Sequence, residues 1–376
     1  MQKKLRVGLF FGGRSVEHEV SVITALQAFE NLDKNKYEII PVYVSKAGDF
    51  YTSSKFLDLK KYKDIDSLIL QAAKITFIKG GLQPFGFFHK FIPLDLALPL
   101  FHGSFGEDGS FQGLLEMMQI PYVGFRVLGS AVAMDKALSK LVFQAMGLPI
   151  GKYVVIKRGE KPDVSDLKFP LVVKPATVGS SIGINKVEKP EDLEFYIEVA
   201  GTYSEKILIE EAFEGCIEVN CSALGYRDIK VSVCEQPIPT AVFLTFEDKY
   251  QKSLPAGRQG SMKSMTRKIP APISQKLTKE IQEATKKIFL ILDGCGVARI
   301  DFFVDPEQEK FWVNEVNSPP GSLAYYLWEA SGIKFSKLLD MLIEFALERA
   351  EDQKKTTYTF ESGLLSKIAQ KGGIKN

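Results

Sequence analysis

Two short runs near the C-terminal end of the chain alternate apolar with polar residues. They cover residues 298–304 and 311–317, and the polar, turn-forming segment 305–310 separates them. Alternation on both sides of a turn is the pattern of a β-hairpin, in which successive side chains point to opposite faces. The sequence therefore predicts an antiparallel pair of strands in this region.

Four polar side chains of this hairpin should lie close together. A hairpin centred on Gln308 places Asp301 opposite Glu315 and Arg299 opposite Asn317. Two carboxylates and an amide oxygen then lie beside a guanidinium, and Mg²⁺ binds through one or two carboxylates together with water and substrate phosphates. The pattern predicts a site for a metal and a nucleotide, and the alternative is an edge hairpin with a solvated, salt-bridged face.

The length and charge of the chain limit the classes of protein that it can belong to. A chain of 376 residues exceeds what one hydrophobic core usually supports, so two or three domains are expected. A net charge of +2 gives no electrostatic reason to expect a nucleic acid or a membrane surface as partner. A net charge near zero is still compatible with the binding of small anionic ligands.

The cysteines and the apolar runs indicate the cellular compartment of the protein. Cys216, Cys221, Cys234 and Cys295 show no CxxC spacing, and a chain of this length does not depend on disulfides. The apolar run near the start is too short for a signal peptide, and no run reaches membrane-spanning length. We expect a soluble protein in the reducing cytoplasm.

The N-terminal part has the pattern of an α/β domain. An apolar run over 5–11 ends in two glycines and precedes a helical pattern, and further strands are expected over 37–44 and 94–101. The glycine turns at 12–15 and 102–109 should lie at the carboxyl ends of parallel strands, where ligands bind in open sheets. Neither turn is GxGxxG and the chain has no GxxxxGK[ST], so phosphates must be held by other means.

A second segment is suited to binding phosphate. A short apolar strand ends at Lys174, and the Gly/Ser-rich loop 176–184 follows it. Backbone N–H groups and hydroxyls can donate to a phosphate while the ammonium supplies charge, although an ordinary exposed hairpin has the same composition. Elsewhere the sequence predicts helices over 130–146 and 333–349, and a polar, glycine-rich loop or lid over 252–266.

Five motifs follow one another in a single order along the chain. They are Gly12-Gly13-Arg14-Ser15-Val16-Glu17-His18-Glu19-Val20-Ser21, His102-Gly103-Ser104-Phe105-Gly106-Glu107-Asp108-Gly109, Met134-Asp135-Lys136, Val173-Lys174-Pro175 with Gly179-Ser180-Ser181-Ile182-Gly183, and Arg299-Ile300-Asp301 with Asn314-Glu315-Val316-Asn317. Together they resemble the D-alanine-D-alanine ligases of the ATP-grasp superfamily, and the resemblance runs from about residue 5 to residue 349.

The resemblance implies a fold of α/β and α+β parts. An N-terminal Rossmann-like, pre-ATP-grasp domain is expected over 1–125, a small central ATP-grasp domain over 126–218, and a C-terminal catalytic domain over 219–350. The polar, lysine-rich residues 351–376 are expected to be a peripheral tail. ATP would lie between the sheets of the central and C-terminal domains, which accounts for the missing P-loop.

The resemblance also implies a reaction. ATP phosphorylates the carboxylate of a first D-alanine, and the amine of a second D-alanine attacks the acyl phosphate to give the dipeptide, ADP and phosphate for peptidoglycan. Two Mg²⁺ (or Mn²⁺) ions are expected per site, together with a homodimer and no nucleic-acid or membrane partner.

Individual residues acquire expected roles by the same resemblance. Those expected in catalysis are Glu17, Ser180, Tyr250, Arg299 and Gly321. Those expected to bind the nucleotide are Lys136, Lys174, Ser181, Glu210, Phe213, Glu218, Lys249 and Phe303. The expected metal ligands are Asp301, Glu315 and Asn317. Those expected to bind the amino-acid substrates are Val20, His102, Ser322, Tyr326 and Leu327.

Two departures from the family pattern leave alternatives open. Cys216 stands where the ribose-binding glutamate is expected, and Glu218 shares its face of the strand. Tyr326-Leu327 aligns with the usual Ser-Leu pair of the acceptor pocket, so D-lactate, D-serine or glycine could be the acceptor. An ATP-grasp ligase with another acceptor, and a nucleotide-binding regulator without turnover, are therefore the alternative functions.

Overall fold

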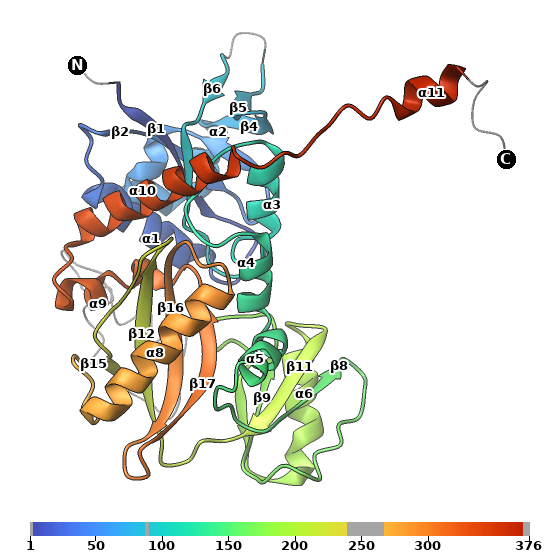
Figure 1. Ribbon diagram of the computed structural model, residues 1–376, viewed down its shortest axis with the longest axis vertical. Coiled ribbons are helices and arrows are strands. Elements are labelled where there is room, and N and C mark those ends of the chain that lie inside the picture. The colour runs from blue at the N-terminus through green and yellow to red at the C-terminus, as the bar shows by residue number, and fades with distance from the viewer. Residues whose placement is uncertain (1–2, 87–89, 239–266, 371–376) are drawn as a thin grey trace.

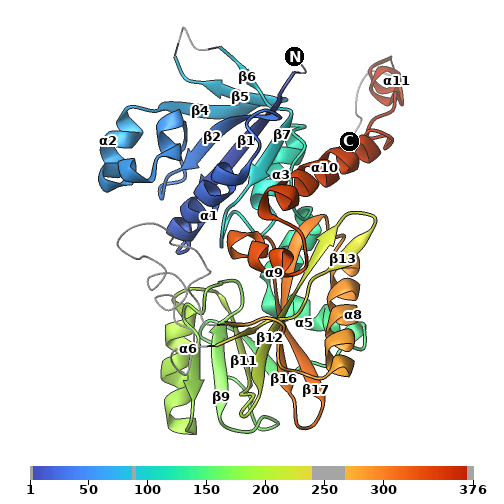
Figure 2. The same ribbon diagram turned by 90° about the vertical axis from the view of Figure 1, so that its left-hand side faces the viewer.

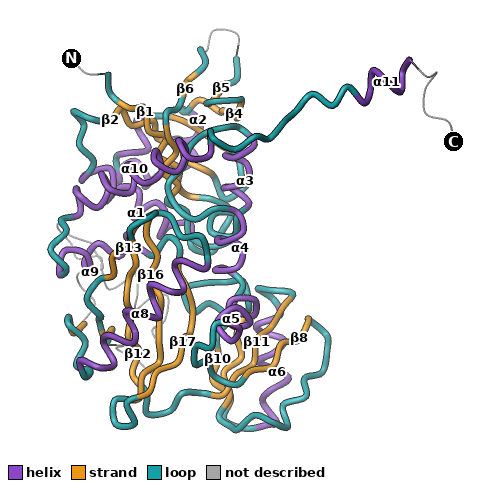
Figure 3. The backbone as a smooth tube through the Cα atoms, in the orientation of Figure 1, coloured by secondary structure: helices purple, strands orange, loops and turns teal. Residues whose placement is uncertain are grey.

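The computed structural model describes residues 3–86, 90–238 and 267–370. Within these residues the strands form a seven-stranded sheet, two four-stranded sheets and a two-stranded sheet. Figures 1 and 2 show the seven-stranded sheet at one end of the molecule and the two four-stranded sheets side by side at the other. Helices cover the sheets, as the purple segments in Figure 3 show, so the mixed α/β and α+β composition expected from the sequence is confirmed.

The seven-stranded sheet has the order β6-β5-β4-β3-β2-β1-β7. Its strands are β1 (Leu5–Gly12), β2 (Tyr37–Val44), β3 (Phe50–Thr52), β4 (Ala73–Ile78), β5 (Gly81–Pro84), β6 (Ile92–Pro93) and β7 (Leu96–Pro99). The strand β1 is parallel to both β2 and β7, as its almost continuous apolar run indicates, because a parallel strand covered on both faces needs no alternation. The carboxyl ends of these strands point toward the other two large sheets.

The helices of the N-terminal region flank this sheet. They are α1 (His18–Asn31), the 3₁₀ helices η1 (Ser54–Leu57) and η2 (Leu59–Asp64), α2 (Ile65–Leu70) and α3 (Ser110–Met117). Glu17 is the N-cap residue of α1. The glycine turn that joins β1 to α1 therefore positions Glu17 at the end of the sheet. Gly12 adopts a φ of +91°, and a side chain there would meet the Val44 carbonyl, so only glycine fits this turn.

The helix predicted over 130–146 is interrupted, and the prediction of a single helix was wrong. The structure has α4 (Val127–Met134) and α5 (Lys136–Ala145) with Asp135 between them in an extended conformation. The Asp135 carboxylate accepts hydrogen bonds from the backbone N–H groups of Ala137 and Leu138, and so begins a new helix. The break places Lys136 in the first turn of α5.

The second large sheet has the order β10-β9-β11-β8 and is antiparallel throughout. It is built from β8 (Tyr153–Lys157), β9 (Leu171–Pro175), β10 (Asn185–Val187) and β11 (Lys206–Glu211), with η3 (Pro190–Asp192) and α6 (Leu193–Gly201) beside it. The apolar side chains of this sheet are buried against α6. Lys174 lies near the C-terminal end of β9 and points toward the third sheet.

The third large sheet has the order β13-β12-β16-β17. It contains β12 (Ile217–Gly225), β13 (Ile229–Val231), β16 (Gly296–Asp305) and β17 (Lys310–Asn317), and the short pair β14 (Gln236–Pro237) and β15 (Arg267–Lys268) lies nearby. The helix α8 (Gln275–Ile291) buries Leu277, Ile281 and Ile288 against one face of this sheet. The other face is left for the polar side chains of the hairpin.

The C-terminal helices return to the first sheet. The segments η5 (Gly321–Ala324), α9 (Tyr325–Ala330) and α10 (Phe335–Gln353) contribute to the same apolar core as β1 and β7. The tail contains one further helix, α11 (Leu364–Gln370), which the sequence did not predict and which extends away from the body in Figure 1. Because the N-terminal and C-terminal segments share this core, the turn after β17 is held next to α1.

Two smaller findings concern membranes and disulfides. In the three described stretches of chain, each helix is too short or too polar to span a membrane. All four cysteines are free thiols, as the absence of paired spacing predicted.

Candidate functional site

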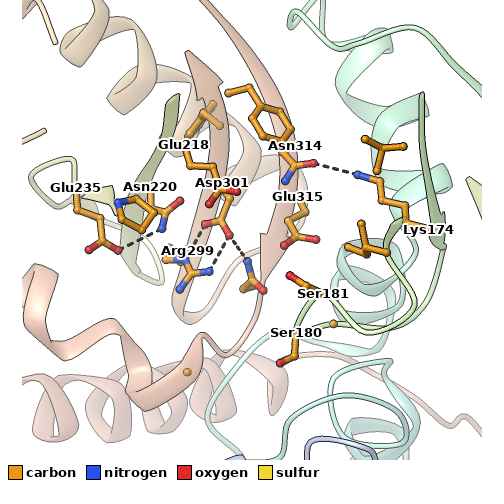
Figure 4. A pocket seen from close by; sticks show the side chains of 18 of the residues that line it. Lys174, Ser180, Ser181, Glu218, Asn220, Glu235, Arg299, Asp301, Asn314 and Glu315 are labelled. Atoms are coloured by element: carbon orange, nitrogen blue, oxygen red, sulfur yellow. Dashed lines mark hydrogen bonds and ion pairs between the residues drawn. The ribbon is translucent and has the colours of Figure 1, made fainter. Parts of the chain in front are cut away.

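One cleft collects side chains from all three large sheets. Glu17 and His102 enter it from the first sheet, and Lys174, Ser180, Ser181, Glu210 and Phe213 from the second. The third sheet and the turn after it contribute Glu218, Arg299, Asp301, Phe303, Glu315, Asn317, Gly321 and Tyr326. Figure 4 shows Arg299 and Asp301 on one side and Lys174 on the other, with Asn314 and Glu315 between them. The sequence motifs thus converge although they are spread over about 300 residues.

The hairpin of β16 and β17 has the predicted register. Asp301 pairs with Glu315 and Arg299 pairs with Asn317, which confirms the pairing inferred from alternation. A bulge between Asp301 and Phe302 then shifts the register by one residue. Bulges re-aim side chains, and Asn314 here reaches the cleft, where its Oδ1 accepts a hydrogen bond of 3.2 Å from Lys174 Nζ.

Arg299 and Asp301 form the most tightly joined pair of the hairpin. Arg299 donates from Nε to Asp301 Oδ1 (2.6 Å) and from Nη2 to Oδ2 (2.7 Å), and Asn317 Nδ2 donates to the same Oδ2 (3.0 Å). Burial by itself would lower the pKa of Arg299, and the neighbouring Asp301 carboxylate raises it above its usual value. Arg299 is therefore a fixed positive charge in the centre of the cleft.

Three lysines surround the carboxylates on the other side of the cleft. Glu210, on β11, is bonded to Lys174 and lies 2.8 Å from Lys140 Nζ, and all three side chains are almost fully buried. Burial by itself would raise the pKa of Glu210, and the two ammonium groups lower it to about 2. Lys136 Nζ donates to the Val178 carbonyl (2.9 Å) and lies 3.2 Å from Glu315. These lysines concentrate positive charge where two sheets meet.

Glu17 occupies the end of the cleft nearest the first sheet. Its Oε1 accepts a hydrogen bond from the Ser180 hydroxyl, so the predicted link between the first and second sheets is present. Its Oε2 is buried without a hydrogen-bond partner in the described part of the chain. Burial and the nearby Glu107 carboxylate raise the pKa of Glu17. A buried carboxylate oxygen of this kind is suited to a cationic ligand.

Backbone shape brings the loops close to Glu17. A Cβ at Gly179 would lie 2.8 Å from Glu17 Oε2, and one at Gly103 would lie 2.9 Å from it, so a side chain at either position would force the Glu17 carboxylate to shift. Ser180 and Ser181 hold left-handed φ angles of +55° and +60°, which are uncommon for residues other than glycine. Such backbone strain is often found at ligand sites.

Aromatic rings form the far end of the cleft. Phe213 and Phe303 stack with their centroids 4.7 Å apart, and Trp312 packs beside Phe213 at 5.1 Å. Glu218 lines the cleft at this end, whereas Cys216, on the same side of the chain, is not among the lining residues of the described structure. An apolar end with a carboxylate beside it suits a flat heterocycle that carries a sugar.

Several predicted substrate residues lie behind the cleft surface. Val20 and Leu327 are buried in the apolar packing, and Ser322 donates its hydroxyl hydrogen to Gln27 Oε1 at 2.7 Å. His102 lines the cleft, with Nδ1 3.5 Å from Glu107 and Nε2 3.1 Å from Thr24. Lys249, Tyr250 and the loop predicted over 252–266 lie outside the described residues.

The cleft also contains residues to which the sequence analysis assigned no role. They are Asn220, Glu235, Arg267 and Asn314, and Lys140 lies directly behind Glu210. Lys140 follows Lys136 by one helical turn, a spacing that places both on one face of α5 and could have indicated it. Asn220, Glu235 and Arg267 carry no local signal, because their convergence depends on the sheet topology, and Asn314 stands in a quoted motif but reaches the cleft through the bulge.

Comparisons with known proteins give the same family over both halves of the chain. A model of the D-ala D-ala ligase N-terminus matches residues 6–125, and a model of the D-ala D-ala ligase C-terminus matches residues 142–344. The D-alanine-D-alanine ligase of Thermosipho melanesiensis is 37% identical over 360 residues, covering 93% of this chain and 96% of that protein.

Two solved structures resemble the fold. The D-alanine-D-alanine ligase from Coxiella burnetii has a TM-score of 0.81 and 30% identity, covering 94% of this chain and 96% of its own. The VanG D-Ala:D-Ser ligase from Enterococcus faecalis has a TM-score of 0.77 and 30% identity, covering 92% of this chain and all of its own. With its three sheets and the site between them, the chain belongs to the D-alanine-D-alanine ligase family and has the ATP-grasp fold.

Proposed function

We propose that this protein is an ATP-dependent ligase that joins two D-alanine molecules for peptidoglycan synthesis. The observation that carries the proposal is the single cleft in which a buried carboxylate, buried lysines and a fixed arginine converge on the oxygen-rich hairpin. A donor carboxylate oxygen attacks the γ-phosphorus of ATP and ADP leaves. The neutral amine of the acceptor then attacks the acyl carbon, phosphate leaves with that oxygen, and the nitrogen loses one proton to become the amide N–H.

The donor amino acid is assigned to the Glu17 end of the cleft. The buried Oε2 of Glu17 is assigned to accept from the donor ammonium, while Oε1 stays bonded to Ser180. His102 lines the same end, and the buried Val20 is assigned to this end by resemblance. We assign Tyr250 to this end as well, by resemblance. The donor carboxylate then points toward Lys174 and Arg299.

The nucleotide is assigned to the space between the second and third sheets. Phe213, Phe303 and Glu210 are assigned to the adenine end, and Glu218 is preferred to Cys216 for the ribose because it lines the cleft. Lys136, Lys174 and Ser181 are assigned to the phosphates, together with Lys249 by resemblance. Positive charge directed at a transferring phosphoryl group is the main electrostatic aid to such a reaction.

The metal ligands are assigned to the hairpin. Within the described residues no three His, Cys, Asp or Glu side chains are grouped as a metal site, and the proposed donor set combines two carboxylates with an amide. Asp301 and Glu315 pair across the hairpin and Asn317 touches Asp301, which fits hard oxygen ligation of two Mg²⁺ or Mn²⁺ ions. When bound, these ions would neutralise charge on the phosphate oxygens.

Arg299 and Gly321 are assigned to the reacting carbonyl. Arg299 is held rigidly by Asp301, so its orientation needs no rearrangement during the reaction. Gly321 lines the cleft directly after the Pro319-Pro320 turn, and its N–H is assigned by resemblance as the second donor to the developing oxyanion. A nucleotide-binding regulator would not need this arginine beside a full set of metal ligands.

The second candidate function differs only in the acceptor. Tyr326 replaces the small serine of the family pattern in the acceptor region, and one structural relative is named as a D-Ala:D-Ser ligase. D-lactate, D-serine and glycine are therefore tested beside D-alanine. Leu327 and Ser322 support this region from behind its surface.

The activity is tested by measuring ADP release from purified protein with ATP and Mg²⁺, and by mass analysis of the product. D-alanine should stimulate ADP release and give alanyl-alanine, and L-alanine should not. Release without any amino-acid dependence would contradict the ligase assignment. A homodimer in the cytoplasm is proposed by resemblance, and light scattering of the eluted protein tests the dimer.

A further inference from the structure

A buried polar cluster lies beside Arg299 at the acceptor end of the cleft. It consists of Asn220, Glu235, Arg267 and Tyr326, and all four line the same cleft as Arg299. Figure 4 shows Glu235 and Asn220 beyond Arg299, at the opposite end of the row from Lys174. None of the steps assigned above to phosphate, metal or donor uses this cluster.

Glu235 is the centre of the cluster. Its side chain is almost completely buried, and its Oε1 accepts hydrogen bonds from the Tyr326 hydroxyl (2.8 Å) and from Asn220 Nδ2 (3.2 Å). Its Oε2 accepts from Arg267 Nη1 at 3.0 Å. Three donors thus hold this carboxylate in place, and it serves to orient its neighbours.

The Tyr326 hydroxyl cannot act as the family serine would. Its single hydrogen is donated to Glu235, and burial together with that carboxylate raises the pKa of Tyr326, so the hydroxyl stays protonated and engaged. A substrate carboxylate, which can only accept hydrogen bonds, therefore gains no donor from this residue. Another group must supply the donor in this part of the cleft.

Arg267 is the group that can supply this hydrogen-bond donor. Its guanidinium lies 3.8 Å from the centre of the Tyr326 ring, and its side chain is only 11% exposed. The ring and Glu235 together fix the plane of the guanidinium, which reduces the entropy lost when a ligand binds. A planar guanidinium has several N–H donors whose geometry matches a carboxylate, and Arg267 uses Nη1 to hold Glu235.

We propose that Arg267 binds the α-carboxylate of the acceptor amino acid, and that Glu235 and Tyr326 are positioning residues for it. The proposal rests on the proposed ligase function. The acceptor then lies on the Arg267 side of Arg299, opposite the donor, and its amine faces the acyl phosphate. Arg267 thereby selects acceptors that carry a free carboxylate.

The test removes the carboxylate from the acceptor and the guanidinium from the protein. Wild type, Arg267→Met and Arg267→Lys are supplied with ATP, Mg²⁺ and a mixture of D-alanine and D-alaninamide, and the dipeptide and dipeptide amide are separated by mass. Because both products come from the same enzyme molecules, their ratio is independent of how much variant is folded. Lys268→Met is the matched control, since Lys268 is adjacent on β15 but exposed to solvent.

The wild type should strongly prefer D-alanine as acceptor. Arg267→Met should lower the ratio of dipeptide to amide by about 10- to 150-fold, the worth of a hydrogen bond between charged groups. Arg267→Lys should restore part of the preference, and Lys268→Met should leave it unchanged.

Three results would overturn the proposal. An unchanged product ratio in Arg267→Met, even with slower turnover, would leave Arg267 only a structural role. An equal loss of preference in Lys268→Met would mean that general surface charge acts instead. Absence of both products from the wild type would overturn the proposed ligase function as well, and this outcome is recognised before any variant is compared.

Discussion

The buried group of Lys140, Glu210 and Lys174 should contribute strongly to stability. Lys140 Nζ lies 2.8 Å from Glu210, and the side chains are 1% and 3% exposed. At an effective dielectric constant of about 20, two unit charges at that distance attract by about 6 kcal/mol. Desolvation offsets part of this attraction, and removing one partner of a buried pair typically costs about 3 to 5 kcal/mol. When Lys140 is removed, Glu210 still has its ion pair with Lys174, so we expect the lower end of this range.

The variant Lys140→Met should therefore unfold about 3 kcal/mol more easily than the wild type. Methionine nearly preserves the volume of the side chain, so the loss reports on charge. Urea unfolding followed by circular dichroism measures it, and Lys276→Met is the control, because the Lys276–Glu309 pair is exposed and should change stability little. If the two variants unfolded at the same urea concentration, the buried group would not contribute as argued.

The pH dependence provides a second test of the same group. Lys140 and Lys174 lower the pKa of Glu210 from its usual 4.5 to about 2 in the folded protein. A lowered carboxyl pKa adds stability above pH 4.5, and this stability is lost as the pH falls toward 2. In Lys140→Met the pKa of Glu210 is less depressed, so the stability difference from the wild type should be full at pH 7 and smaller at pH 3. A difference that grew as the pH fell would refute the assignment.

Three further predictions concern the cleft. Arg299→Ala should lower kcat by about 100- to 1000-fold while equilibrium dialysis still detects ATP binding, and undiminished turnover would remove Arg299 from the mechanism. Burial and Glu107 raise the pKa of Glu17, so kcat/KM for D-alanine should fall on acidification at a pH above 4.5, and Glu17→Gln should be slow at every pH without that acid limb. Gly179→Ala should raise KM for D-alanine, because its Cβ would lie 2.8 Å from Glu17 Oε2, whereas Gly113→Ala, with its nearest neighbour at 3.9 Å, should leave KM unchanged.

Local patterns in the sequence predicted the parts of the fold that depend on neighbouring residues. Alternation of apolar and polar residues was sufficient to pair Asp301 with Glu315, because the period of a strand fixes the face of each side chain. The apolar run at 5–11 likewise indicated a buried parallel strand. The break at Asp135 was missed, since one capping side chain overrides an otherwise continuous helical pattern.

The parts of the site that sequence reasoning missed are assembled by distant contacts. Glu235 and Arg267 stand in no recognisable sequence motif. They come together in the cleft only because β14 and β15 pair beside α9. Asn314 reaches Lys174 because of a bulge that the alternating pattern does not indicate. Topology and irregularities of register, which residue types alone do not encode, determine these contacts.

The most direct test of the central claim follows one oxygen atom. D-alanine labelled with ¹⁸O in both carboxylate positions is supplied with ATP and Mg²⁺, and the inorganic phosphate released is analysed by mass. Attack of the donor carboxylate on the γ-phosphate predicts one ¹⁸O atom in each phosphate for each dipeptide formed. Phosphate without ¹⁸O, released together with dipeptide, would contradict ligation through an acyl phosphate.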